Sequence, residues 1–469
     1  MQSPRYGSLL LMLGLSLLFG LLSLHVGVFW DNVLFVSKTG TFLYEHGLSR
    51  WFDMPVSQYS AHPYLCGTYY ALIWKLFGRS LLVSHLATIP FVFGVLYQIW
   101  KLCSYFIKTS KQQYAAFLLI CTCPVLCSHC VQIGQELFIL FFALYALNAI
   151  LRQEQIHKAI ALCFLPLFSL RAMMLCAGLF LTEWMLCTIR SRCFWTARTI
   201  CSYLGGAMIS IAYLMVRYGI FSDAPRAMHT GYFDYTSLIQ ILYTCVRNIV
   251  VFAWDYVDFG QITLFVVGAV IFIRHRDTIM QKDIRFKELF ICTLLPCSLI
   301  ILTSIVSLNP FGHHYFLISF LVCILMAYYL LQYSVHTSWL YTLCIVSLLA
   351  GNFIVYPEYK AQGWQNSLAH LPYWSLRRQA IQELDKLNIP LEQTASFFPN
   401  VCENDFVELN DDHRSFCEFT GENEYLFYSS CFNPTNNEIT LIHNTYEPLF
   451  ICKRGLVWVQ VLQRKSSTP

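Results

Sequence analysis

The sequence predicts a mainly α-helical protein that crosses a membrane many times and ends in a small α/β domain. Three observations predict this fold class: a length of 469 residues, a hydrophobic content of 57% and a charged content of only 12%. An ordinary soluble domain has roughly 25% charged residues, and the mean hydropathy here is +0.52. The composition excludes a water-soluble enzyme and a disordered protein. The net charge of +4 gives no indication of nucleic-acid binding.

About eleven apolar stretches are long enough to cross, or nearly cross, a bilayer. They centre on residues 8–28, 82–102, 114–131, 136–151, 158–170, 172–189, 199–217, 257–273, 289–307, 314–332 and 338–355. The first is expected to stay as a permanent helix, because no convincing signal-peptide cleavage site follows it. Arg171 lies between two stretches, and a charge in mid-bilayer costs a few kcal/mol. We therefore expect a turn at the membrane surface there.

Lysine and arginine in short loops predict the orientation of the spans. The basic loops lie around Lys101–Lys111, Arg152–Lys158, Arg190–Arg198 and Arg274–Lys287, and they are assigned to the cytoplasm. The remaining loops, 29–81, 132–135, 218–256 and 308–313, and the tail after 356 are then outside. The segment 237–253 is apolar but contains Gln240 and Arg247. It either lies flat in the outer interface or forms a twelfth crossing.

Acidic residues become dense from about residue 357 onward, which predicts a domain boundary. Residues 1–356 would form the transmembrane domain and residues 357–469 a soluble extracytoplasmic domain. Within the second, the pattern predicts a helix over Tyr373–Leu387 and strands near Ala395–Phe398, Glu424–Ser430 and Val457–Leu462. Its four cysteines are Cys402, Cys417, Cys431 and Cys452. One or two disulfides would suit an oxidising compartment, and the sequence does not choose among the pairings.

Polar residues gather at the outer ends of the predicted spans. They are Asp31, His62, Glu136, Arg171, Arg247, Asp255, Asp258 and the pair His313-His314. A transporter would place ionisable residues near the bilayer midplane, and a pore would line its path with polar rings. Polar residues at one face instead favour an enzyme that acts at the interface on a lipid-borne substrate and an outside substrate.

Several short motifs resemble a known family in their order along the chain. They are Trp30-Asp31-Asn32, His62-Pro63-Tyr64, Gly134-Gln135-Glu136, Ser169-Leu170-Arg171 and Gly312-His313-His314-Tyr315. Together they resemble the polytopic GT-C glycosyltransferases of the dolichyl-phosphate-mannose protein mannosyltransferase superfamily, a group that includes the lipid A aminoarabinose transferase. The resemblance covers the membrane part. No single motif is specific, and the weight lies in their order and common side.

The resemblance implies a polyprenyl-phosphate sugar donor, transfer with inversion, and catalysis on the extracytoplasmic face. The acceptor would be a protein, lipid A or another glycan. No cofactor is implied, and relatives with monophosphate donors generally work without a catalytic metal ion. The protein would lie in a bacterial inner membrane, with the site and the C-terminal domain on the periplasmic side.

The motif positions also imply roles for individual residues. Asp31 would be the base that takes the proton from the acceptor hydroxyl, and Glu136 a second catalytic acid. The donor phosphate would be bound by His62, Arg171, His313 and His314. His314 departs from the family pattern, because many relatives have arginine there and histidine is only partly charged near neutral pH.

Each of these residues also has a structural interpretation. Asp31 can be a headgroup-facing helix end, and Glu136 a helix N-terminal charge favoured by the dipole. His62 and Arg171 can anchor loops, and His313-His314 can be a structural pair or metal ligands. At the level of the whole protein, two other functions compete with glycosyl transfer. One is a transporter or flippase of a lipid-linked saccharide, and the other is an envelope scaffold that binds through its tail.

Overall fold

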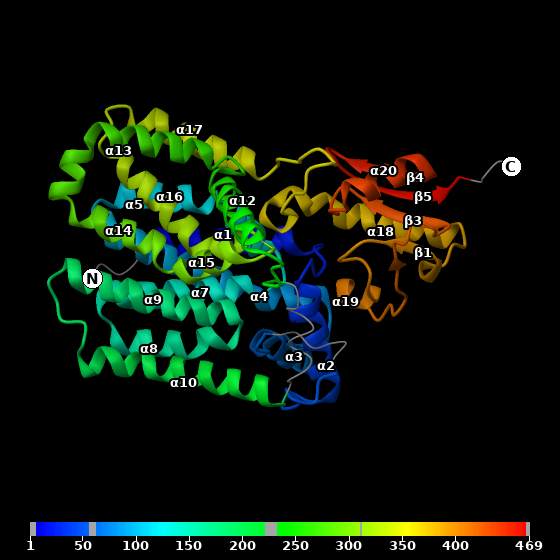
Figure 1. The fold of residues 1–469 in the computed structure, drawn as a ribbon, viewed down its shortest axis with the longest axis horizontal. Coiled ribbons are helices and arrows are strands. Elements are labelled where there is room, and N and C mark those ends of the chain that lie inside the picture. Colours follow the sequence, from blue (N-terminus) through cyan, green and yellow to red (C-terminus); the bar gives the residue numbers. More distant parts are fainter. Residues whose placement is uncertain (1–5, 56–61, 221–231, 310–311, 466–469) are drawn as a thin grey trace.

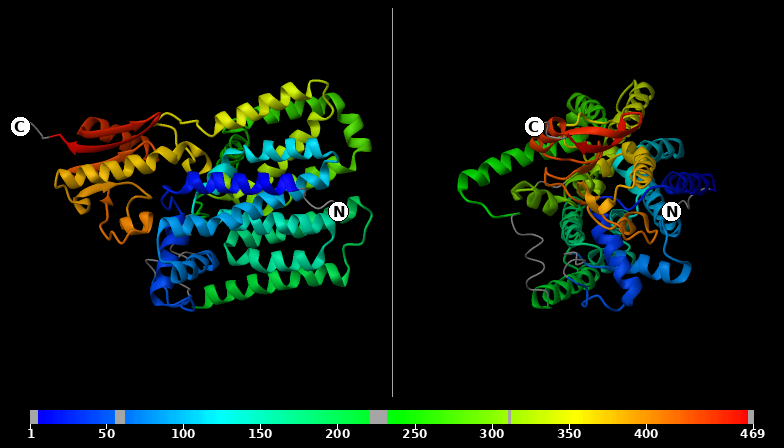
Figure 2. Two further views of the ribbon diagram at one scale, coloured as in Figure 1. Left: turned by 180° about the vertical axis from the view of Figure 1, so that it is seen from behind. Right: turned by 90° about the vertical axis from the view of Figure 1, so that its right-hand side faces the viewer.

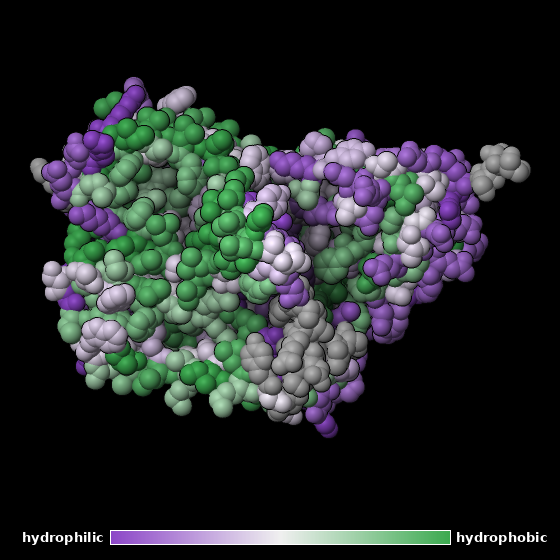
Figure 3. All heavy atoms as spheres, in the orientation of Figure 1, coloured by the Kyte–Doolittle hydropathy of each residue, from purple (hydrophilic) through white to green (hydrophobic). Residues whose placement is uncertain are grey.

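The computed structural model describes residues 6–55, 62–220, 232–309 and 312–465. Most helices run side by side in a bundle, and the C-terminal sheet lies at one end of it (Figure 1). On the face shown in Figure 3, hydrophobic residues cover the bundle, while hydrophilic residues collect on the sheet and at the opposite end of the bundle. The apolar middle and the two polar ends match the arrangement expected of a protein embedded in a bilayer.

Every apolar stretch found in the sequence overlaps a helix. The helices of the bundle and its loops are α1 (Tyr6–Ser23), α2 (Thr39–His46), α3 (Leu65–Phe77), α4 (Leu81–Phe106), α5 (Ser110–Cys121), α6 (Pro124–Val131), α7 (Glu136–Arg152), α8 (Gln155–Phe164), α9 (Leu170–Ile189), α10 (Ala197–Ile220), α12 (Leu238–Val257), α13 (Ile262–Lys282), α14 (Ile284–Leu294), α15 (Ser298–Val306), α16 (Leu317–Leu331) and α17 (Thr337–Gly351).

Within the described residues, six helices are long and apolar enough to cross a membrane, or up to eight if each of two bent pairs is one span. The bent pairs are α5–α6, with an angle of 69°, and α14–α15, with an angle of 42°. Pro124 and Pro296 lie at these breaks, where the missing proline N–H interrupts helical hydrogen bonding. The figure of about eleven crossings stays a prediction.

The segment 237–253 forms most of α12, whose direction differs from that of the bundle. The helix runs across the end of the bundle beside the sheet, and its length is visible in the view along the bundle (Figures 1 and 2). Its polar residues contact the end of α15 and the residues that follow it. Arg247 donates to the Leu308 carbonyl, and the Asn248 amide donates to the Ser304 and Ser307 carbonyls. This direction favours the interfacial interpretation over a twelfth crossing.

The C-terminal domain is a five-stranded mixed sheet with α18 (Leu371–Lys386) packed on it. Its strands are β1 (Thr394–Ser396), β2 (Cys417–Glu418), β3 (Tyr425–Ser429), β4 (Tyr446–Arg454) and β5 (Val457–Arg464), in the order β2-β1-β3-β5-β4. β1 pairs in parallel with β2 and β3, and the other pairs are antiparallel. The short helices α19 (Asn404–Glu408) and α20 (Asn436–Thr445) complete the domain.

The tail helix and the three predicted strands all lie at the expected places. Two strands were not predicted, the two-residue β2 and the longer β4. In β4 the usual strand pattern is broken. Pro448 interrupts its pattern and coincides with a register shift between Pro448 and Phe450. An edge strand tolerates proline because one of its sides needs no ladder hydrogen bond. The suggested tail disulfides are absent, because all twenty cysteines are free thiols.

Polar contacts attach the sheet domain to the bundle, both at Arg79 and at the loop after α1. Arg79 makes a bidentate ion pair with Asp405, with N–O distances of 2.7 and 2.6 Å. The Val28 N–H donates to the Val407 carbonyl at 2.8 Å. Although burial raises the pKa of Asp405, the hydrogen bonds and charge of Arg79 dominate and hold that pKa below its usual range.

We expect the variant Arg79→Met to lose about 3–5 kcal/mol of unfolding free energy, because it leaves the buried Asp405 carboxylate unpaired. Thermal unfolding in detergent measures this. Since the pKa of Asp405 is depressed in the folded state, the difference from wild type should be present near neutral pH and shrink as the pH falls through that pKa.

The matched control is Arg50→Met, which removes an ion pair with Asp53 in which both side chains are exposed. Such pairs contribute about 0–1 kcal/mol. Equal losses in the two variants would contradict the assigned role of Arg79.

Candidate active site

Asp31 lies in a tight loop between α1 and the π-helical turn η1 (Val33–Lys38). The preceding residue, Trp30, has a φ of 50°, a left-handed conformation that costs a non-glycine residue about 1–3 kcal/mol. Aromatic packing holds it there: the Trp30 ring lies 5.5 Å from Phe398, and the Phe29 ring lies 5.2 Å from His370. Residues of the tail therefore fix the loop that carries Asp31.

Gly134 brings the loop before α7 against the Asp31 loop. A Cβ atom at position 134 would lie 2.7 Å from Oδ1 of Asn32, which is closer than real Cβ contacts allow. Any other residue here would push Asn32 aside. The glycine thus lets the first outer loop approach the start of α7, two residues before Glu136.

Glu136 and Arg171 form a buried ion pair between the first turns of α7 and α9. The distance from Nη2 of Arg171 to Oε1 of Glu136 is 2.7 Å, and only 8% and 7% of these residues is exposed. A carboxylate suits a helix N-terminus, whereas a cation there opposes the dipole. Ser169 caps α9 by accepting a hydrogen bond from the Ala172 N–H at 3.0 Å. The turn expected near Arg171 is therefore present.

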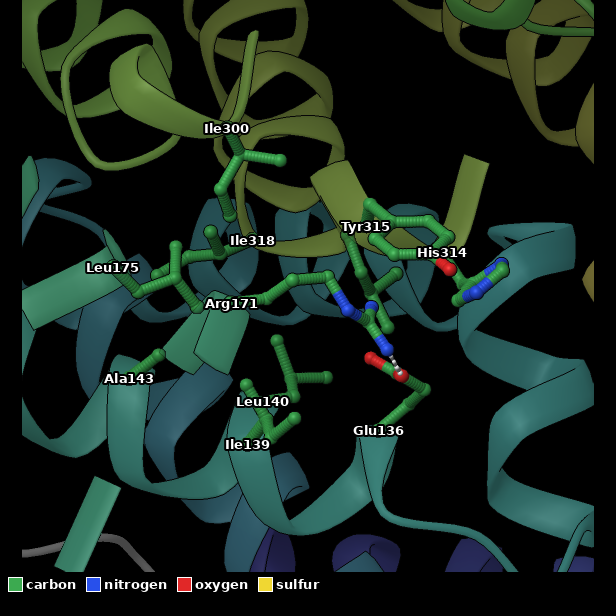
Figure 4. Close-up of a pocket in the computed structure, with 11 residues that line it drawn as sticks. Glu136, Ile139, Leu140, Ala143, Arg171, Leu175, Ile300, His314, Tyr315 and Ile318 are labelled. Atoms are coloured by element: carbon green, nitrogen blue, oxygen red, sulfur yellow. Dashed lines mark hydrogen bonds and ion pairs between the residues drawn. The ribbon is translucent and has the colours of Figure 1, made fainter. Parts of the chain in front are cut away.

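Two further side chains hold the guanidinium of Arg171. Its Cζ lies 3.6 Å from the centre of the Tyr315 ring, a cation–π contact (Figure 4). The amide of Gln135, in the orientation that satisfies both of its groups, accepts from Arg171 at 3.3 Å and donates to the Phe168 carbonyl at 3.0 Å. The cation is thus fixed from three sides before any ligand binds.

A cavity of about 20 Å³ lies beside this ion pair. Glu136, Arg171, His314 and Tyr315 form its polar side (Figure 4). Its apolar side consists of Ile139, Leu140, Ala143, Leu175, Ile300, Leu317 and Ile318. A buried charged pair therefore borders a small cavity whose opposite wall is apolar.

Asp31 belongs electrostatically to the same group. Burial raises the pKa of its carboxyl, the positive charge of Arg171 lowers it, and the negative charge of Glu136 raises it again, with a net upward shift. Asp31, Glu136 and Arg171 come from three separate segments of the chain. The structure places the three charges within electrostatic range of one another. Their location on the outer face stays a prediction.

His62 also reaches this region. Its Nδ1 accepts a hydrogen bond from the backbone N–H of Leu170 at 3.3 Å, and its ring packs edge-on against Phe35 at 4.7 Å. Because Nδ1 is the acceptor, the neutral ring carries its proton on Nε2. His62 therefore links the first outer loop to the start of α9, next to Arg171.

The two adjacent histidines point to different partners. His313 lies with Nε2 at 3.4 Å from Asp255 and 3.3 Å from Asp258. His314 lines the cavity, but its ring points away from the Glu136–Arg171 pair (Figure 4) and contacts the Gln365 amide at 3.2 Å. Only His314 of the pair therefore borders the cavity of Arg171.

Asp258 is the centre of a second polar cluster. It accepts hydrogen bonds from its neighbour Phe259, at 2.8 Å, and from the hydroxyl of Tyr356. Burial raises its pKa, but the contacts with His313 and Tyr356 outweigh burial and lower the pKa overall. The described residues contain no group of three or more His, Cys, Asp or Glu side chains arranged to hold a metal ion.

Tyr315, Gln135 and Gln365 also belong to the candidate site, although they were not singled out from the sequence. Tyr315 and Gln135 stand inside the quoted motifs, directly beside His314 and Glu136, so adjacency was a usable signal. Gln365 had no such signal, because its contact with His314 joins the tail to the membrane part.

Comparisons with known proteins extend this picture. No protein-family model matches the chain, and no curated protein matches it. Two solved structures of ArnT from Cupriavidus metallidurans do match. One, bound to undecaprenyl phosphate, has 13% identity and a TM-score of 0.52, covering 99% of both chains.

The other, in the apo state, has 11% identity and a TM-score of 0.53, covering 97% of this chain and 98% of ArnT. The chain has the fold of ArnT. This likeness confirms the GT-C fold class that the ordered motifs predicted, over almost the whole length of both proteins. At this identity, the likeness to ArnT concerns the fold and assigns no residue roles.

We expect Glu136→Leu to reduce the unfolding free energy by about 3–5 kcal/mol, because it leaves the Arg171 guanidinium buried without its carboxylate. Thermal unfolding of the detergent-solubilised protein measures the loss. Arg50→Leu is the control: its ion pair with Asp53 has the same 2.7 Å distance but is exposed. A loss below 1 kcal/mol for Glu136→Leu would contradict a structural ion pair.

Proposed function

We propose that the protein is a membrane glycosyltransferase that moves a sugar from a polyprenyl-phosphate donor to an extracytoplasmic acceptor, which is a protein, lipid A or a glycan. The observation that carries the proposal is the electrostatic grouping of Asp31 with the Glu136–Arg171 pair, which borders a small cavity with an apolar wall. The fold of ArnT supports it, because one ArnT structure contains undecaprenyl phosphate.

In the proposed reaction, Asp31 takes the proton from an acceptor hydroxyl. The acceptor oxygen forms a bond to the anomeric carbon of the sugar while the bond from that carbon to the phosphate oxygen breaks. The electron pair leaves with the polyprenyl phosphate, and the sugar inverts its configuration. A raised pKa makes Asp31 a stronger base than an exposed aspartate, and general-base help is typically worth about 10²–10⁴-fold.

Arg171 is the group best placed to hold the departing phosphate. A guanidinium has five N–H donors in a fixed plane, and Glu136 and Gln135 engage only one of its nitrogens. Phosphate oxygens can accept from the others as negative charge develops. We assign Glu136 to positioning Arg171, since the contact fixes the cation before the donor arrives.

The histidines differ in how close they lie to Arg171, and we propose different roles for them. His62 and His314 border the region of Arg171 and are proposed to contact the donor phosphate or its first hydroxyl groups. His313 was expected from the sequence to bind the phosphate as well. We propose only a secondary role for it, because the carboxylates of Asp255 and Asp258 engage its ring. We also propose a bacterial inner-membrane location, a periplasmic site, and a division of the chain at residues 356 and 357.

Asp31→Asn should lower the rate of sugar transfer by about 10²–10⁴-fold, because the amide cannot accept the hydroxyl proton. The measurement uses the full-length protein in nanodiscs with synthetic polyprenyl-phosphate hexoses and pentoses, and it follows the release of polyprenyl phosphate. Asp53→Asn, on the exposed surface, is the matched control. Near-normal turnover of Asp31→Asn would remove the mechanism.

The same preparation in proteoliposomes separates the proposal from its rival. A transporter of lipid-linked saccharide would move the labelled lipid between leaflets and leave its sugar–phosphate bond intact in both variants.

The acidic limb of the pH–rate profile should report Asp31, since the base works only when deprotonated. Glu136→Gln removes a negative charge that raises the pKa of Asp31, so the limb should move to lower pH. Arg171→Gln removes a charge that lowers this pKa, so the limb should move to higher pH. Profiles of kcat/KM against pH for the two variants and for wild type test the direction of each shift. Shifts in the same direction would contradict the electrostatic grouping of Asp31, Glu136 and Arg171.

A further inference from the structure

A second cavity, of about 310 Å³, lies between the linker that follows α17 and the sheet domain. We call it the linker pocket. Its residues are Val355, Tyr356, Pro357, Glu358, Lys360, Gln362 and Trp364 of the linker, and Ser430, Phe432, Asn433, Leu456 and Trp458 of the sheet domain. Its volume is within the range of small-molecule sites, about 300–1,000 Å³, and such sites are common between domains.

The polar walls of the linker pocket are held in place by contacts around it. The side chain of Asn433 bonds to the backbone of Gln362 in both directions, at 3.1 and 3.0 Å. Glu358 accepts a hydrogen bond from the hydroxyl of Tyr428, and its other oxygen lies 3.1 Å from Nε2 of His443. A carboxylate and an amide of fixed orientation therefore line the pocket before any ligand binds.

Aromatic rings and one cation complete the pocket. Trp458 is half-buried, and its ring packs edge-on against Tyr428 at 5.1 Å, which leaves its indole in the lining. The Lys360 ammonium lies 4.0 Å from the ring centre of Tyr356 and 4.1 Å from that of Trp254 on α12. These contacts hold an exposed cation beside the pocket.

A short chain of contacts connects this pocket with the candidate active site. Tyr356, which lines the pocket, donates its hydroxyl hydrogen to Asp258, and Asp258 lies 3.3 Å from Nε2 of His313. The next residue, His314, borders the cavity of Arg171. A molecule held in the linker pocket would therefore lie on the side of the site where the sheet domain meets the bundle.

We propose that the linker pocket binds one sugar ring of the acceptor, so that the acceptor is a glycan or glycolipid. The inference rests on the proposed function and names the acceptor class for the same site. A sugar ring offers an apolar C–H face, which can pack on the indole of Trp458. Its hydroxyl groups can donate to the Glu358 carboxylate and accept from Lys360.

A peptide acceptor fits this pocket less well. Extended peptides bind by adding a strand to a free sheet edge. The sheet-domain wall of the pocket consists of the residues that follow β3, the start of β5 and the β4–β5 turn. Both β3 and β5 have neighbouring strands on two sides. No unpaired edge faces the pocket, so backbone pairing with a peptide is unavailable to it within the described strands.

The binding test uses saturation-transfer NMR on the full-length protein in nanodiscs. The probes are methyl β-glucoside, methyl β-glucosaminide and methyl β-glucuronide, which differ in charge. Wild type should transfer saturation to the ring C–H protons of at least one probe, and Trp458→Leu should remove most of that signal. Lys453→Ala, an exposed change on β4, should retain it. Absence of a signal from all three probes, or an equal signal in Trp458→Leu, overturns the proposal.

A second pair of variants covers the case in which Trp458→Leu disturbs the sheet. Lys360→Ala should weaken the glucuronide signal at least tenfold more than the glucoside signal. Glu358→Gln should weaken the glucoside signal at least tenfold more than the glucuronide signal. Each variant must keep the thermal unfolding midpoint of wild type. Unchanged signals in both variants also overturn the proposal.

Cleavage of the donor by water distinguishes this inference from the proposed function. Trp458→Leu should leave that cleavage near the wild-type rate, whereas Asp31→Asn should stop it. If the probes bind but Asp31→Asn cleaves the donor at the wild-type rate, the proposed function is rejected and the linker pocket is retained. Cleavage that depends on Asp31, without probe binding, would reject the linker pocket alone.

Discussion

The ion pair between Glu136 and Arg171 is the interaction on which the rest of the site depends. A buried charge loses its hydration, and an opposite charge in direct contact must offset that loss. Here that requirement fixes the starts of α7 and α9 at one depth and in one orientation. The same pair sets the potential that Asp31 experiences, because its two charges act on the Asp31 pKa with opposite signs. A packing constraint and an electrostatic one are therefore satisfied together.

The helical framework could be read almost completely from the sequence. In a membrane protein, burial in lipid requires long apolar runs, so hydropathy reports helices directly. The stretch 136–151 became α7 almost residue for residue, and the tail prediction over Tyr373–Leu387 became α18. The candidate residues Asp31, Glu136 and Arg171 were singled out because charges at span ends stand out against an apolar background.

Other features depend on tertiary contacts that no local pattern encodes. His313 and His314 are neighbours in sequence, yet one contacts the α12 carboxylates and the other borders the Arg171 cavity. Their directions follow from a 3-10 turn, over His313–Phe316, that hydropathy does not reveal. The break between α5 and α6 was also hidden, since a bent pair of short helices has the composition of one span.

The left-handed backbone of Trp30 has a consequence for biosynthesis. Phe29 and Trp30 are among the first residues of the chain to be made, but His370, Trp374 and Phe398, which support them, are made more than three hundred residues later. Proteins are synthesised from the N-terminus, so a partly inserted chain has Asp31 without the aromatic support that fixes its loop. The conformation of this loop thus depends on residues that are made in the last part of translation.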